Sequence, residues 1–120
     1  MRAMADVTIY HNPRCTKSRQ AMQVVDELGV DADVVKYLET PPDAATLRSI
    51  IDKLDGPVSD LVRREKWEEL GVRADDVSTP DGVVDVLVRH PQLMQRPIVV
   101  KGDRAVIGRP TELVTELLTS

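Results

Sequence analysis

The sequence predicts an α/β domain with a four-stranded mixed sheet flanked by helices and a helical insert between the second and third strands. Three observations predict this class. Short β-branched runs occur near both ends of the chain, and apolar residues at three- and four-residue spacing follow the first two runs. A short Lys-Gly-Asp turn separates the last two runs, as in a hairpin. A length of 120 residues fits one domain over residues 1–120, with residues 1–6 as a short extension.

The first elements follow from local sequence signals. Residues 7–10 are β-branched and aromatic and predict a strand, which the turn-forming pair Asn12-Pro13 ends. Residues 16–28 place their apolar side chains on one helical face, and Gly29 is expected just past the end of this helix.

A second strand is predicted at residues 34–38, and a second helix is expected to begin with Asp43 as its N-cap. The region from about 56 to 92 has no strand pattern and is predicted to be helical. Its last helix is expected to start with Thr79 as N-cap and Pro80 as the first helical residue.

The end of the chain returns to strands. Residues 97–100 and 104–108 predict a hairpin, and Pro110 is expected to open a final helix. The order strand, helix, strand, helices, two strands and helix is a thioredoxin-like topology.

Composition excludes several function classes. The chain has 16 basic and 20 acidic residues, a net charge of −4, one cysteine, one tryptophan and two tyrosines. One cysteine excludes an intrachain disulfide and any site that needs several thiolates, and no metal site is predicted. Acidity and few aromatics argue against nucleic-acid binding. No apolar stretch suits a signal peptide or a membrane span, so a cytoplasmic protein is predicted.

Cys15 is the candidate nucleophile. It lies where the first strand meets the first helix, among polar and charged residues rather than the apolar neighbours of a structural cysteine. The helix N-terminus and the cations Arg14, Lys17 and Arg19 favour the thiolate over the thiol. The ring of His11 could add a further donor if it folds toward the sulfur.

The same turn offers a small oxyanion pocket, formed by free amides and the hydroxyls of Thr16 and Ser18. The residues that follow Cys15 then exclude two kinds of thiol chemistry. A tyrosine-phosphatase loop needs arginine six residues after its cysteine, where this chain has Ala21. A dithiol oxidoreductase needs a second cysteine at the position of Ser18. Any redox cycle of Cys15 therefore requires an external thiol.

Arginines far along the chain are candidates to complete the oxyanion site, because guanidinium groups supply forked donors. Arg96 precedes Pro97, and in a thioredoxin-like fold this bond is expected to be cis and to face the catalytic loop. Arg109 follows the hairpin at the same edge of the sheet. Arg63 lies in the insert, where the adjacent Arg64 is an alternative.

Several motifs resemble those of the glutaredoxin-coupled arsenate reductase (ArsC) family, in order from about residue 7 to residue 118. They are His11-Asn12-Pro13-x-Cys15-x-x-Ser18-Arg19, Tyr37-Leu38-Glu39-Thr40-Pro41-Pro42, Leu61-Val62-Arg63, Glu69-Leu70-Gly71, His90-Pro91, Arg96-Pro97-Ile98-Val99-Val100 and Gly108-Arg109-Pro110.

The resemblance implies a complete reaction. Cys15 would attack arsenate, Arg63, Arg96 and Arg109 would hold the oxyanion and its covalent adduct, and His11 would assist the thiolate. No bound cofactor is implied. A low-molecular-weight thiol, glutathione or mycothiol, would complete the reduction to arsenite, and a glutaredoxin-like redoxin would regenerate the thiol.

Two other functions fit the same fold. A regulator of the Spx type would bind RNA polymerase and sense oxidation through a Cys-x-x-Cys motif. This chain lacks that redox switch, because Ser18 stands at the position of the second cysteine. A monothiol oxidoreductase would reduce glutathione mixed disulfides and would need no arsenate.

Overall fold

The computed structural model describes residues 6–120, so the expected extension lies outside the described residues except for Asp6. Four strands form one mixed sheet in the order β2-β1-β3-β4. The strands are β1 (Val7–His11), β2 (Ala32–Lys36), β3 (Ile98–Lys101) and β4 (Arg104–Ile107). β1 pairs parallel with β2 and antiparallel with β3, and β3 pairs antiparallel with β4. The predicted four-stranded mixed sheet is confirmed.

The second strand begins and ends two residues earlier than predicted, at Ala32 and Lys36. The backbone of Glu39 and Thr40 explains where it ends, because both of their N–H groups donate to the carbonyl oxygen of Lys36 at 2.9 Å. This turn closes the strand before Tyr37.

Of the long helices, the first three begin where the sequence places their caps, whereas the last begins at Glu112, two residues after the start predicted at Pro110. The long helices are α1 (Thr16–Glu27), α2 (Ala44–Lys53), α4 (Pro80–Arg89) and α5 (Glu112–Thr119). The Asp43 carboxylate accepts from Thr46 N–H at 2.8 Å, and Thr79 Oγ1 accepts from Gly82 N–H at 3.1 Å. Both side chains satisfy a free amide of the first turn.

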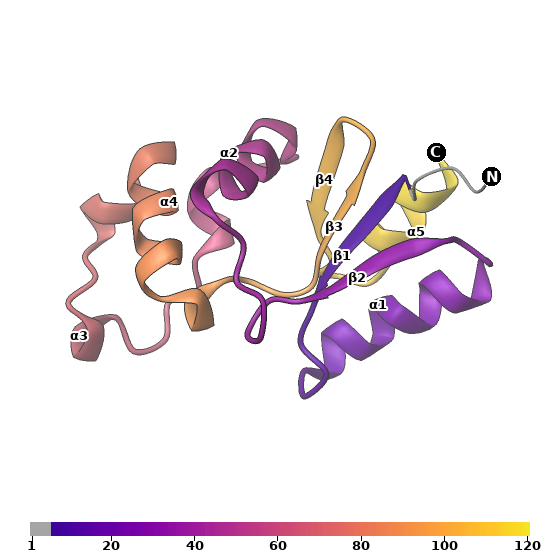
Figure 1. Cartoon of the computed structure of the whole chain (residues 1–120), viewed down its shortest axis with the longest axis horizontal. Coiled ribbons are helices and arrows are strands. Elements are labelled where there is room, and N and C mark those ends of the chain that lie inside the picture. The colour runs from indigo at the N-terminus through magenta and orange to yellow at the C-terminus, as the bar shows by residue number, and fades with distance from the viewer. Residues whose placement is uncertain (1–5) are drawn as a thin grey trace.

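The segment between β2 and β3 contains helical elements, as predicted for the insert. Besides α2 and α4 it holds the short helix α3 (Trp67–Leu70) and three 3-10 turns, η1 (Val58–Leu61), η2 (Ala74–Val77) and η3 (Pro91–Leu93). Figure 1 shows α1 and α5 together on one side of the sheet, whereas α2 and the insert extend away from the other side. No helix within residues 6–120 is long and apolar enough to cross a membrane.

Two hydrophobic cores lie on opposite faces of the sheet, because successive strand side chains point to opposite faces. On β1, Ile9 packs in the core under α1 and α5, and Tyr10 packs in the core under α2 and α4. On β3, Val99 belongs to the first core and Ile98 to the second. The sheet is therefore covered on both faces, and the ends of its strands are left to build a site.

Gly108 allows a close approach between the end of β4 and the segment before β3. A Cβ atom at this position would lie 2.7 Å from Pro97 Cγ and 2.9 Å from Val114 Cγ2. Both neighbours are fully buried. The missing side chain lets the Gly108 N–H donate to the Pro97 carbonyl at 2.8 Å.

Gly108→Ala should therefore lower the free energy of unfolding by about 1–3 kcal/mol, because the added methyl group overpacks a filled core. Urea denaturation monitored by circular dichroism measures this. Thr115→Ala, on the exposed side of α5, is the control and should change stability by less than about 0.5 kcal/mol. Equal stability of both variants would contradict the packing argument.

Candidate active site

The turn between β1 and α1 places Cys15 at the N-cap of α1. Its backbone is extended, with φ −92° and ψ 124°, and its N–H donates to the Asn12 carbonyl at 3.0 Å. The Asn12 side-chain oxygen accepts from Arg14 N–H at 3.0 Å, which tightens the turn. Cys15 is a free thiol and is partly exposed. Its sulfur therefore lies at the amino end of a twelve-residue helix.

Several groups act on the sulfur, and together they lower the pKa of Cys15. Burial opposes this shift, but it is outweighed by the Ser18 backbone N–H, by the side chain of Arg96 and by the Lys17 backbone N–H. In addition, Arg109 Nη2 lies 3.5 Å from Sγ. Arg109 therefore contacts the sulfur, and Arg96 lowers its pKa both as a side-chain donor and through its charge, so guanidinium groups of two segments border the thiolate.

Hydrogen bonds to backbone carbonyl groups hold Arg96 and Arg109 together. The Arg96–Pro97 bond is cis, as expected from the sequence, and the Arg109–Pro110 bond is also cis. Arg109 Nε donates to the Arg96 carbonyl at 2.8 Å, beside the bond between Gly108 and Pro97. Two arginines separated by thirteen residues therefore start from adjacent backbone.

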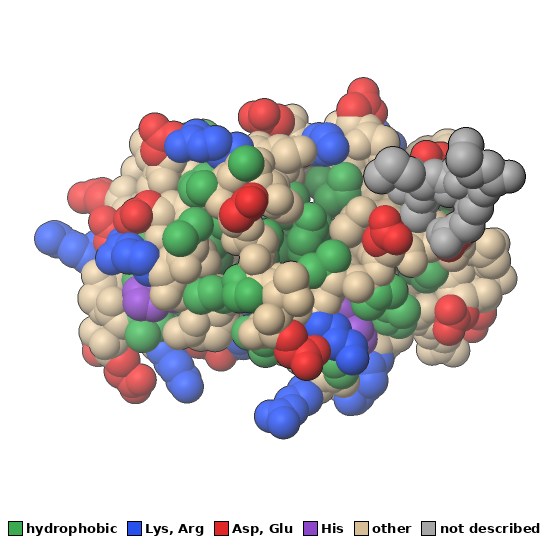
Figure 2. Space-filling view, viewed as in Figure 1, with side chains coloured by type: hydrophobic (Ala, Val, Ile, Leu, Met, Phe, Trp, Pro, Cys, Tyr) green, Lys and Arg blue, Asp and Glu red, His purple; other side chains and the backbone are tan. Residues whose placement is uncertain are grey.

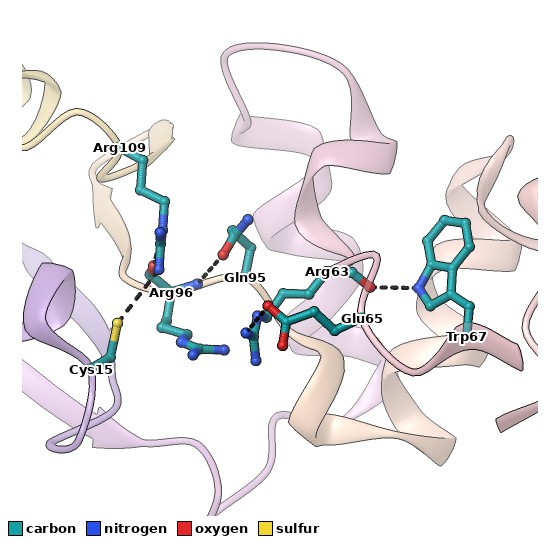
Figure 3. Close-up of polar contacts among 7 residues, drawn as sticks. All are labelled: Cys15, Arg63, Glu65, Trp67, Gln95, Arg96 and Arg109. Atoms are coloured by element: carbon teal, nitrogen blue, oxygen red, sulfur yellow. Dashed lines mark hydrogen bonds and ion pairs between the residues drawn. The ribbon is translucent and has the colours of Figure 1, made fainter. Parts of the chain in front are cut away.

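Arg63 joins the site through a short pairing of the insert with the segment before β3. Val62 and Met94 form an antiparallel bridge, and Arg63 N–H donates to the Leu93 carbonyl at 2.7 Å. Figure 3 shows the side chains of Arg63 and Arg96 reaching toward one another while Arg109 points at Cys15.

The Arg63 side chain already has a partner, because its Nη2 lies 2.5 Å from Glu65 Oε1. Its carbonyl oxygen accepts from Trp67 Nε1 at 2.5 Å. The Glu65 side chain is 67% exposed, so an anion can compete with it for the guanidinium group. The neighbouring Arg64 instead lies over the Trp67 ring, 5.5 Å from its centre. Arg63, and not Arg64, therefore shares the region of Arg96.

His11 and Ser18 form a buried pair that supports the turn. His11 Nδ1 and Ser18 Oγ are hydrogen-bonded at 3.1 Å, and Ser18 Oγ also accepts from Asn12 N–H at 3.0 Å. Burial lowers the pKa of His11, and the nearby Lys36 and Arg19 lower it further, which favours a neutral ring. The ring therefore contacts Ser18 rather than the sulfur. Ser18 meets Cys15 through its backbone N–H, while its hydroxyl is fully buried.

The remaining polar residues of the turn are exposed. Arg19 donates to the Pro13 carbonyl at 3.2 Å and to Thr16 Oγ1 at 3.3 Å. Lys17 acts on the sulfur through its backbone N–H, and the charge that lowers the pKa comes from Arg96 rather than from the cations of the turn. Figure 2 shows basic side chains gathered at this turn, on a surface where acidic and basic groups are otherwise mixed.

Tyr37 is a site residue that residue-by-residue reasoning did not find. It is fully buried, and its hydroxyl and Arg96 Nε have no hydrogen-bond partner within residues 6–120. Burial raises the pKa of Tyr37, while Arg96, the nearby Asn12 side chain and Arg63 act in the opposite direction. Its position one residue after β2, beside the end of β1, could have indicated from the sequence that it lies near Cys15.

Together these groups form a candidate site for thiol chemistry on an oxyanion. A thiolate can attack an electrophilic centre while helix amides and guanidinium groups hold its oxygen atoms. Within residues 6–120 the structure contains no cluster of three or more His, Cys, Asp or Glu side chains that could hold a metal ion.

Comparison with known proteins identifies the family. The model of the ArsC family matches residues 10–117. The uncharacterized protein YfgD of Escherichia coli is 44% identical over 115 residues, covering 93% of this chain and 96% of its own. An arsenate reductase of Neisseria meningitidis is 39% identical over 118 residues and covers 96% and 100% of the two chains. The solved structure of an arsenate reductase from Vibrio cholerae superposes with a TM-score of 0.80 at 35% identity, covering 95% and 98%.

The thioredoxin-like fold and the single cysteine at the start of α1 thus occur in a chain that is similar over almost its whole length to arsenate reductases. The chain belongs to the ArsC family.

The lowered pKa of Cys15 predicts its reactivity with iodoacetamide as a function of pH. Only the thiolate reacts, so the rate rises with pH through the pKa, and its midpoint should lie below the value of about 8.5 for a free thiol. Arg96→Gln should move the midpoint to higher pH, because it removes a positive charge and a donor. Arg48→Gln, at an exposed ion pair with Asp81, should leave it unchanged. A wild-type midpoint at or above 8.5 would contradict thiolate stabilisation.

The unpartnered hydroxyl of Tyr37 predicts an unusual effect of Tyr37→Phe. An unsatisfied buried hydroxyl costs stability, so its removal should leave the free energy of unfolding unchanged or raise it by up to about 1 kcal/mol. Urea denaturation at pH 7 measures this. A loss of more than about 1 kcal/mol would show that the hydroxyl has a partner in solution.

Proposed function

We propose that this protein reduces arsenate to arsenite, with Cys15 as the nucleophile and an external thiol as the second electron donor. The contact between Arg109 and the Cys15 sulfur, within a site that also includes Arg96, supports the proposal most directly. A nucleophile with two positive charges beside it would suit one tetrahedral oxyanion. Arsenate is such an anion, and relatives at 39% identity are named arsenate reductases.

The first step is attack by the thiolate. The Cys15 sulfur forms a bond to arsenic(V), and one arsenate oxygen leaves as water after taking up protons. Arg96 and Arg109 neutralise the charge on the oxygens that remain, and the Ser18 and Lys17 amides stabilise the sulfur before it reacts. Arg63 would join them after exchanging Glu65 for an arsenate oxygen.

The second step is attack by an external thiolate on the Cys15 sulfur. A sulfur–sulfur bond forms, and the electron pair of the sulfur–arsenic bond stays on arsenic, which becomes arsenic(III) and leaves as arsenite. The balance is one arsenate and two thiols giving arsenite, water and one mixed disulfide. Position 18 carries serine, so a thiol within the chain cannot resolve that disulfide, and a redoxin must do so.

The reductant is proposed to be a low-molecular-weight thiol together with a glutaredoxin-like redoxin, in the reducing cytoplasm. Each remaining site residue has a separate proposed role. His11 orients Ser18 and, through it, the amide that contacts sulfur. Thr16, exposed beside Cys15, can donate its hydroxyl to a bound oxyanion.

The decisive experiment is arsenate-dependent oxidation of NADPH, coupled through glutathione reductase, glutathione and glutaredoxin, and repeated with a mycothiol system. Cys15→Ala should reduce turnover by more than about 1,000-fold, because it removes the nucleophile. Thr115→Ala is the control, and circular dichroism checks that both variants fold.

Two results would refute the proposal: absence of arsenate-dependent turnover with every thiol and redoxin pair, or unchanged turnover in Cys15→Ala. Activity on a glutathionylated peptide without arsenate would instead indicate a monothiol oxidoreductase.

A further inference from the structure

The first step of the proposed reaction needs a proton donor. The arsenate oxygen that departs has to leave as water, because hydroxide is a poor leaving group. Guanidinium groups keep their protons in proteins, so the arginines of the site cannot supply this proton. His11 is hydrogen-bonded to Ser18 Oγ at 3.1 Å, and burial lowers the pKa of its ring, which favours a neutral ring engaged with Ser18. A donor within the protein has to be sought among the other residues of the site.

The end of β2 places Tyr37 beside the turn that carries Cys15. β1 and β2 pair in parallel, and His11 lies opposite Lys36 at the last position of the register. Tyr37 follows Lys36 directly, and the turn to Cys15 follows His11. The two segments therefore leave the same edge of the sheet side by side. The Tyr37 hydroxyl lies close enough to Cys15 and Arg96 for their charges to act on its pKa.

The Tyr37 hydroxyl and Arg96 Nε are both available as donors. The Tyr37 side chain is fully buried, and its hydroxyl has no hydrogen-bond partner among residues 6–120. Arg96 Nε is buried and unpartnered within the same residues. Each atom carries a hydrogen, and buried donors in native proteins nearly always meet an acceptor. Two such donors beside one thiol point to a ligand with acceptor oxygen atoms.

The surroundings of the hydroxyl suit a general acid. Burial raises the pKa of Tyr37 and the Cys15 sulfur raises it further, so the phenol is protonated at neutral pH. Arg96, the Asn12 side chain and Arg63 act in the opposite direction, because they stabilise the phenolate. The same groups would therefore stabilise the phenolate that remains after the proton has been transferred.

We infer that Tyr37 is a catalytic residue of this site, whose hydroxyl donates to the arsenate oxygen beside Arg96 and gives that oxygen the proton with which it leaves as water. The inference rests on the proposed function. The Cys15 sulfur bonds to arsenic, the bond from arsenic to the departing hydroxyl breaks, and its electron pair stays on oxygen. That oxygen takes the Tyr37 proton, arsenic remains arsenic(V), and the phenolate regains a proton from solvent.

The inference requires the arginine side chains to move when the anion binds, because the Tyr37 hydroxyl is closed to solvent. Figure 3 shows Arg63 and Arg96 reaching toward one another. Arg63 is bound to the exposed Glu65 carboxylate, and the proposed reaction already exchanges this partner for an arsenate oxygen. That exchange would be the movement that brings an oxygen to the hydroxyl.

Tyr37→Phe tests the inference, because it removes the hydroxyl and keeps the ring. The kcat/KM for arsenate should fall by about 100-fold or more, the usual contribution of a general acid. Tyr10→Phe is the matched control and should leave kcat/KM unchanged. Tyr10 is the only other tyrosine, is also buried, and has its pKa raised by burial and by Asp43 rather than by groups of the site. Equal values of kcat/KM in the two variants would overturn the inference.

Binding of phosphate separates proton transfer from simple positioning. Phosphate has the shape and charge of arsenate and is not reduced by thiols, so calorimetry measures its Kd without turnover. Tyr37→Phe should raise this Kd by only about 2- to 10-fold, the loss of one neutral hydrogen bond. The activity that remains in Tyr37→Phe should rise with the concentration of imidazole buffer, which can replace the acid. A fall in kcat/KM no larger than the rise in Kd would overturn the acid role.

The inference and the proposed function fail separately. Arsenate turnover in the wild type together with equal kcat/KM in Tyr37→Phe and Tyr10→Phe would refute only the role of Tyr37. Absence of turnover in the wild type would refute the proposed reaction. The phosphate Kd would then still test the contact: a Kd raised in Tyr37→Phe and not in Tyr10→Phe supports it, and equal Kd values overturn it.

Discussion

The position of the three arginines depends on one segment, residues 93–97, which is hydrogen-bonded through its backbone to two distant parts of the chain. Arg63 N–H donates to Leu93 on one side, and Gly108 N–H donates to Pro97 on the other. These bonds fix the backbone position of each arginine independently of the charge on its side chain. The three guanidinium groups repel one another, so interactions elsewhere in the fold must offset this unfavourable electrostatic energy.

Local charge, and not total charge, determines what this acidic protein can bind. The net charge is −4, yet the Cys15 sulfur meets amides of a helix N-terminus and two guanidinium groups. Exposed charges more than about 10 Å away are screened by salt, whereas groups in contact are not. Under the proposed function, the donors that lower the pKa of the thiol would also be the donors that hold the oxyanion.

Buried polar groups near the sulfur divide into a satisfied set and an unsatisfied set. The Ser18 hydroxyl has two partners, His11 and the Asn12 amide, and this set makes the turn rigid. The Tyr37 hydroxyl and Arg96 Nε have none within residues 6–120. Unsatisfied buried polar atoms are uncommon in native proteins. The Tyr37 hydroxyl lies close enough to Arg96, Arg63 and Cys15 for their charges to act on its pKa.

Local signals in the sequence determined most of the fold. The β-branched and aromatic run of β1, the caps Asp43 and Thr79 and the hairpin turn at Gly102 each act through neighbouring residues, and the structure contains all of them. The end of β2 was placed two residues too late, because the turn that ends it uses backbone bonds to Lys36 rather than a glycine or proline signal.

The sequence by itself also identified Cys15 as the candidate nucleophile, because a single thiol at the predicted start of a helix can be recognised from neighbouring residues alone. Only the tertiary structure decided which charges reach that sulfur. Arg96 and Arg109 arrive through the packing of Gly108 on Pro97, and His11 turns to Ser18 because a buried hydroxyl needs a partner. Such contacts join residues far apart in the chain, and their geometry is set by packing that no local pattern encodes.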